Sequence, residues 1–138
     1  MTRRNYSIII AAGMLICLAL NLYNRFVLVP RTMVTFEIHP LSIFCRFVTS
    51  PLSWIFIGMI LAALIFRDGR GVPGQKWDTV LTVIGVLLLI VFWVMVILLY
   101  SGVSTTRTHQ ILAWLSSNPM AFLIPGIFIG IKPWNMAK

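Results

Sequence analysis

Three polar residues near the end of the first apolar run are the part of this sequence best suited to chemistry inside a membrane. Asn21, Asn24 and Arg25 follow a stretch that is almost purely apolar. Residues four apart share a helix face, so Gly13, Cys17, Asn21 and Arg25 are expected to form one stripe, with Asn24 beside it. Such a stripe is small at one end and polar at the other, which predicts contact with a partner helix or a ligand.

Two interpretations of this polar group are open. In the first, the two amides hydrogen-bond across a helix contact while Arg25 extends to the lipid headgroups. In the second, Asn21, Asn24 and Arg25 line a polar, positive cavity that binds an anion or a lipid headgroup. We favour the first, because Arg25 lies only about one turn from the expected end of the membrane span.

The histidines and cysteines are the residues of this chain that could bind a metal ion or haem. His39 and His109 could act as a pair, but only Glu37 lies near His39 and no acidic residue lies near His109. Cys17 and Cys45 form no C-x-x-C motif. We therefore expect interfacial histidines and packing cysteines, and no metal ion or cofactor.

The acidic residues limit which reactions the chain can support. Glu37, Asp68 and Asp78 all lie between the apolar runs. Proton-coupled exporters of cations generally need a carboxylate within the membrane. Lipid kinases and phosphatases need several carboxylates for a metal and a base. No serine stands in a G-x-S-x-G motif, so the sequence predicts a protein without catalytic activity.

Small residues recur at spacings that suit close helix packing. Gly58 and Ala62 form a small-x-x-x-small pair, and Gly126 and Gly130 form a G-x-x-x-G motif. Small side chains let helix backbones approach one another in a membrane. These motifs predict helix contacts, either within one chain or between copies of it.

The composition indicates that most of this chain is surrounded by lipid and not by water. Of the 138 residues, 59% are hydrophobic and 10% are charged, whereas soluble domains carry about 25% charged residues. A chain this short cannot bury so much apolar surface in its own core. We therefore expect a single all-α transmembrane domain embedded in lipid. The formal net charge is +8, and its distribution beside the apolar runs favours anionic lipid headgroups over nucleic acid as partner.

Four apolar runs are expected to cross the membrane, at residues 6–29, 47–66, 79–100 and 111–131. A span of about 20 helical residues matches a hydrocarbon core of about 30 Å. The third run is uncharged throughout. The fourth is interrupted at 116–119 and again at Pro125, so we expect a kinked span, with an interfacial helix leading into a short stub as the alternative.

Four spans would place both termini on one side of the membrane. Seven basic residues would then share that side with the termini, and three would lie opposite. This bias favours cytoplasmic termini in a plasma membrane. The seven are Arg3, Arg4, Arg67, Arg70, Lys76, Lys132 and Lys138, and the three are Arg31, Arg46 and Arg107. Arg67, Arg70 and Lys76, in the loop 67–78, are expected to contact headgroups or a partner.

Two stretches, 39–54 and 109–122, resemble each other. Each begins with a histidine and continues through an apolar segment to a polar pair and then Pro51 or Pro119. The chain could therefore consist of two similar helical hairpins. The alternative is convergence, because proline and aromatic residues are common where chains enter a membrane.

These observations predict a small, non-catalytic, multi-pass membrane protein, most simply an accessory subunit of a larger membrane complex. One alternative is an oligomeric channel or carrier for an anion or polar solute, with Asn21, Asn24 and Arg25 along its path. A further alternative is a protective protein that confers immunity to a membrane-active peptide.

Overall fold

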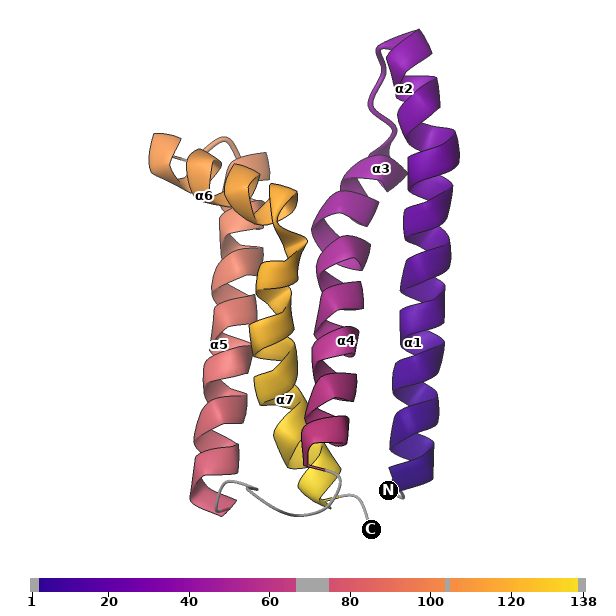
Figure 1. Cartoon of the computed structure of the whole chain (residues 1–138). Coiled ribbons are helices and arrows are strands. Elements are labelled where there is room, and N and C mark those ends of the chain that lie inside the picture. Colours follow the sequence, from indigo (N-terminus) through magenta and orange to yellow (C-terminus); the bar gives the residue numbers. More distant parts are fainter. Residues whose placement is uncertain (1–2, 67–74, 104, 137–138) are drawn as a thin grey trace.

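The computed structural model describes residues 3–66, 75–103 and 105–136, and within these ranges every regular element is a helix (Figure 1). The first long helix comprises α1 (Arg3–Tyr23), a π-helical turn η1 (Asn24–Leu28) and α2 (Val29–Thr35). The second comprises α3 (Pro40–Phe44), a π-helical turn η2 (Cys45–Thr49) and α4 (Ser50–Ile65). The remaining elements are α5 (Gln75–Tyr100), α6 (Thr106–Ser117), the 3₁₀ turn η3 (Pro119–Phe122) and α7 (Leu123–Met136).

The expected all-α architecture is confirmed for the described residues. Three helices are long and apolar enough to cross a membrane, namely Arg4–Thr35, Pro40–Ile65 and Lys76–Tyr100. A fourth crossing arises if Thr106–Ser117 and Pro119–Lys132 are counted as one broken span. The first and last described residues lie at the same end of the bundle (Figure 1).

The fourth apolar run is divided by a sharp bend of 87°. α6 lies across one end of the bundle, and α7 returns beside α5 and α4 (Figure 1). The break falls at Asn118, whose backbone leaves the helical region with φ −123° and ψ 63°. Asn118 precedes Pro119, and a residue before proline is disfavoured in the α conformation. The predicted span 111–131 therefore corresponds to part of the transverse α6, the turn η3 and the first part of α7.

The first two helices are longer than the sequence predicted, and each continues through a proline. The predicted span 6–29 stops just before Pro30, whereas the first helix continues to Thr35. The predicted span 47–66 begins shortly before Pro51, whereas the second helix already starts at Pro40. A proline ring inside an α-helix clashes with the carbonyl four residues earlier and removes one hydrogen bond.

A π-helical turn accommodates each of these prolines. η1 ends at Leu28, two residues before Pro30, and η2 ends at Thr49, two residues before Pro51. In each turn the last N–H bonds to a carbonyl five residues back, Val29 to Asn24 and Ser50 to Cys45. The wider turn lets the helix continue past the ring without ending.

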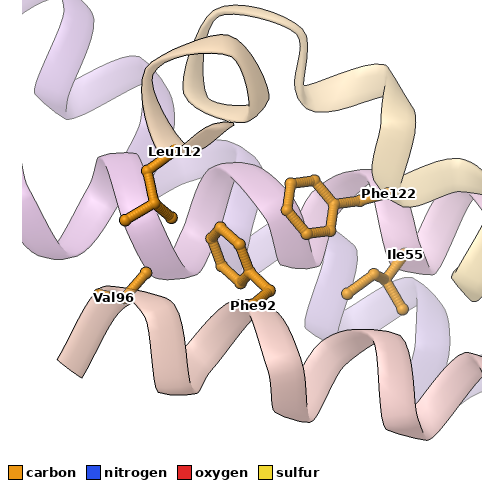
Figure 2. Close-up of a cluster of buried hydrophobic side chains, with 5 residues drawn as sticks. All are labelled: Ile55, Phe92, Val96, Leu112 and Phe122. Atoms are coloured by element: carbon orange, nitrogen blue, oxygen red, sulfur yellow. The ribbon is translucent and has the colours of Figure 1, made fainter. Parts of the chain in front are cut away.

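The core joins α4, α5, α6 and η3 at the end of the bundle covered by α6. Its buried side chains are Ile55, Phe92, Val96, Leu112 and Phe122 (Figure 2). The rings of Phe92 and Phe122 meet edge to face, with centroids 4.7 Å apart. Leu112 is only 2% exposed, so the transverse α6 is anchored by its own apolar side chain.

α4 and α7 pack with their backbones in contact along Gly58, Gly126 and Gly130, which we call the glycine seam. A Cβ atom on Gly126 would lie 2.8 Å from the Cα of Ile55 and would also clash with the Ile55 carbonyl oxygen. A Cβ on Gly130 would lie 3.1 Å from the Cβ of Ala62. The two small-residue motifs of the sequence therefore face each other within one chain.

The two similar stretches of sequence adopt different structures. Residues 39–54 run straight into α4, with Pro51 inside a continuous helix. Residues 109–122 contain the 87° bend, with Pro119 starting a 3₁₀ turn. The helical paths therefore give no support to a repeat of two equivalent hairpins.

Candidate functional site

A polar contact joins α1 to η2 a little past the middle of the first helix. The Thr49 hydroxyl donates to Asn21 Oδ1 at 2.6 Å, and Asn21 Nδ2 donates to the Thr49 carbonyl oxygen at 3.3 Å. Nδ2 also lies 3.5 Å from Ser53 Oγ. Thr49 is 2% exposed, so this pair is shielded from competing donors and acceptors and fixes how the two helices face each other.

Beside this contact the two helices leave a cleft of about 390 Å³, which we call the polar cleft. Asn21 and Asn24 line it from the first helix. From the second helix it is lined by Ser42, Arg46, Ser50 and Ser53, together with Cys45. Val29 and Trp54 complete its walls with apolar surface.

Asn24 stands out within the polar cleft because its amide is not satisfied. The Oδ1 atom is buried and has no hydrogen-bond partner within the described ranges. Buried acceptors normally find a donor, since leaving one unpaired costs about 1–3 kcal/mol. A rotation of the Asn24 side chain that turned this acceptor toward the cleft would let a ligand satisfy it.

Arg46 supplies the positive charge of the polar cleft. Its Nη2 donates to Ser116 Oγ at 3.0 Å, which ties η2 to the transverse helix α6. The guanidinium carbon also lies 5.8 Å from the centre of the Phe47 ring. Along the described parts of the chain no acidic side chain lines this cleft. The guanidinium therefore has donors left over for an anion.

The predicted stripe on the first helix is only partly brought together. Cys17 is buried, and Gly13 lies against the ring of Phe56, but Arg25 is exposed and lies outside the cleft lining. Each step of four residues advances about 40° around an α-helix. Three such steps from Gly13 carry Arg25 about 120° away, while Asn24 stays near the contact face.

The histidines and the remaining basic residues lie elsewhere. His39 caps α3, its Nδ1 accepting a hydrogen bond from the Leu41 N–H at 3.2 Å. His109 lies exposed in α6. Within the described residues no three histidine, cysteine or acidic side chains gather into a metal site. Lys76 is exposed at the start of α5, whereas Arg67 and Arg70 lie outside the described residues.

Sequence reasoning missed the wall of the cleft that the second helix contributes. The missed residues are Ser42, Arg46, Thr49, Ser50 and Ser53. A signal was present, because these polar residues recur at intervals of three or four and so share one helix face. The predicted span began at Phe47, which cut this polar face in two.

Comparison of this chain with protein-family models, with curated proteins and with solved structures gives no match.

The side chains that line the polar cleft can bind a small polar or anionic group. The cleft offers one guanidinium, two amides and several hydroxyls, and no carboxylate or imidazole lines it in the part of the chain that the structure describes. A set of neutral donors around one fixed cation suits recognition of a small anionic or polar group.

Proposed function

We propose that this protein is a non-catalytic accessory subunit that packs against a larger partner in a membrane complex. The observation that carries the proposal is the apolar turn between the first two helices. Met33, Val34, Phe36 and Ile38, which we call the hairpin tip, are 67% to 89% exposed.

The hairpin tip stands beyond the rest of the bundle. α2 extends past α3 and past the transverse α6 (Figure 1). The helix Arg4–Thr35 has 32 residues, or about 48 Å at 1.5 Å per residue. A hydrocarbon core of about 30 Å cannot cover that length. Lipid can cover the apolar faces of the long helices, but it leaves these four side chains in need of a protein partner.

The backbone at the tip adds a second argument. Phe36 adopts the left-handed conformation with φ 56°, and its N–H closes the helix by bonding to the Thr32 carbonyl oxygen. Glycine is the usual residue there, because a side chain costs about 1–2 kcal/mol in this region. A large apolar side chain that is both strained and exposed is best explained by a contact outside this chain.

The partner is expected to follow α1 into the membrane. The hairpin tip is too small to give the roughly 800 Å² per side that a stable interface buries. α1 lies at one edge of the bundle and packs mainly on α4 (Figure 1). Leu15, Ile16 and Leu22 of α1 and Phe26 of η1 are exposed. They extend the apolar surface of the hairpin tip toward the other end of the first helix.

Site-specific photo-crosslinking in the native membrane tests this proposal. A photoreactive residue at Val34 is expected to crosslink a foreign membrane subunit, and native mass spectrometry of the gently extracted complex should show that subunit in fixed stoichiometry. The matched control position is Leu87, exposed on α5 at the opposite edge of the bundle. Crosslinking from Leu87 but not from Val34 would contradict the proposed interface.

A carrier of anions or polar solutes is the second candidate, and the polar cleft favours it. Beyond Cys17, however, the first two helices close on apolar contacts among Tyr6, Ile10 and Phe56. A path through the membrane would therefore have to form between copies. A stable homo-oligomer without a foreign subunit, together with solute flux in liposomes, would support the carrier and exclude the accessory subunit.

A further inference from the structure

The polar cleft holds a positive charge and a hydrogen-bond acceptor that its other side chains do not neutralise or pair. Arg46 brings a positive charge, and no acidic side chain within the described ranges lines the cleft to meet it. Asn24 Oδ1 brings a buried acceptor that lacks a donor among the described residues. A ligand that complements both must present an anionic oxygen and a hydrogen-bond donor close together.

Both helices place these groups at the same height. Asn24 lies twenty residues from Arg4, and Arg46 lies twenty residues from Phe66. Twenty helical residues span about 30 Å, which is the thickness of the hydrocarbon core. α6 crosses the bundle at this height, since its Ser116 bonds to Arg46. The cleft therefore lies where the acyl chains end and the headgroups begin, on the side away from the termini.

The walls of the cleft suit an amphiphile. Its polar side chains gather around Arg46 and Asn24, whereas Trp54 lies one helical turn beyond Ser50, toward the middle of the bundle. Tryptophan favours this boundary because its ring is apolar and its indole N–H is polar. A molecule with a polar head and an apolar stem would match both parts.

We propose that the polar cleft binds the headgroup of a glycerophospholipid that carries a phosphate and a hydrogen-bond donor. The phosphate accepts from Arg46 and from nearby serine hydroxyls, and the donor bonds to Asn24 Oδ1 after the amide turns toward the cleft. Phosphatidylethanolamine has a suitable ammonium and phosphatidylglycerol suitable hydroxyls. Phosphatidylcholine has the phosphate, but its quaternary ammonium has no N–H. This site is independent of the subunit role proposed above.

Native mass spectrometry of the full chain in detergent, titrated with one lipid at a time, tests the assignment. We expect one phosphatidylethanolamine or phosphatidylglycerol to be retained per chain, and phosphatidylcholine to bind roughly tenfold more weakly. Arg46→Gln should weaken binding of the two preferred lipids roughly tenfold. Asn24→Leu should lower the affinity for phosphatidylethanolamine and phosphatidylglycerol to that for phosphatidylcholine, because it removes the acceptor that distinguishes the headgroups.

Two variants serve as matched controls. Arg25→Gln removes the same charge from the residue next to Asn24, but on the exposed face. Ser116→Ala removes the bond to Arg46 without removing its charge. Both should retain the lipid as the wild type does, with unchanged circular dichroism and gel filtration. If Arg46→Gln fails to fold, the headgroup preference of Asn24→Leu tests the proposal by itself.

Three results would overturn the proposal. The first is equal retention of phosphatidylcholine by the wild type. The second is a loss of lipid in Arg25→Gln as large as that in Arg46→Gln. The third is displacement of the lipid by millimolar inorganic phosphate, which would reassign the polar cleft to free phosphate.

Discussion

α4 makes two contacts of opposite character, one with α7 and one with α1. Against α7 it forms the glycine seam, where the backbones touch and no space is left for a methyl group. Against α1, the contact of α4 near Gly13 is made by the far end of the Phe56 ring. Farther along α1, the adjoining turn η2 forms a hydrogen-bonded pair with Asn21 beside an open cleft. The first contact excludes everything else, whereas the second leaves a place for a ligand.

The difference shows how one small bundle can combine a rigid part with an adaptable part. Where two backbones pack directly against each other, neither helix has room to shift, so α4 and α7 are fixed in one arrangement. Polar side chains around a cleft can exchange one partner for another at similar cost. The site of recognition is therefore expected beside α1, and the scaffold is expected between α4 and α7.

The largest effect is predicted for Gly126→Ala in the glycine seam. The new Cβ would meet the backbone of Ile55, which cannot move without separating the helices. We expect a loss of about 2–3 kcal/mol in the free energy of unfolding, measured by titration with SDS in mixed micelles. Gly13→Ala is the matched control, because its Cβ meets only the flexible end of the Phe56 ring. An equal loss in both variants would remove the contrast between the two contacts.

A smaller effect is predicted for Thr49→Val, which removes the hydroxyl of the polar contact but keeps the shape of the side chain. Asn21 Oδ1 would lose its donor at 2.6 Å, and we expect a loss of about 1 kcal/mol in unfolding free energy. A double-mutant cycle with Asn21→Leu isolates the pair. If the losses of the single variants simply add in the double variant, the two side chains do not act as a pair.

A change of opposite sign is predicted for Phe36→Gly in the hairpin tip. Relief of the left-handed strain is partly offset by the greater freedom of glycine in the unfolded chain. We therefore expect unfolding free energy to rise by up to about 1 kcal/mol, while crosslinking of the foreign subunit from Val34 falls. A variant that is less stable yet keeps its partner would contradict the role given to the tip.

The smallest effect is predicted for His39→Ala at the start of the second helix. It removes the cap on the Leu41 N–H at 3.2 Å, which we expect to cost about 0.5 kcal/mol. His39→Asn should keep the stability of the wild type, because an asparagine side chain can accept the same hydrogen bond. A thermal shift on adding zinc to the wild type but not to His39→Asn would instead indicate a metal role for this histidine.

Much of the fold followed from the sequence, and the errors have a common origin. The uncharged run 79–100 closely matches α5, because nothing in it interrupts the helix. Errors occur near Pro30 and Pro51, because the first predicted span ended just before Pro30 and the second began only shortly before Pro51, although a π-helical turn carries each helix past its proline. A proline next to an intact apolar face permits a wider turn as well as a stop, and local sequence does not choose between them.

For the site, the sequence identified Asn21 and Asn24 but not what faces them. It grouped Arg25 with them, whereas the structure brings Arg46 to the cleft instead. Both arginines adjoin apolar segments, and no local feature ranks one above the other. The choice depends on which face of the second helix turns toward α1.

The sequence by itself determined that this protein is helical, that it has runs apolar enough to cross a membrane, and that these runs carry no acidic residue. These properties are local, because a backbone in lipid must satisfy its hydrogen bonds within each helix. The tertiary structure alone decided that Thr49 pairs with Asn21, that Asn24 and Arg46 share a cleft, and that the chain bends at Asn118. Those outcomes depend on how the helices rotate against one another, which packing between distant residues fixes.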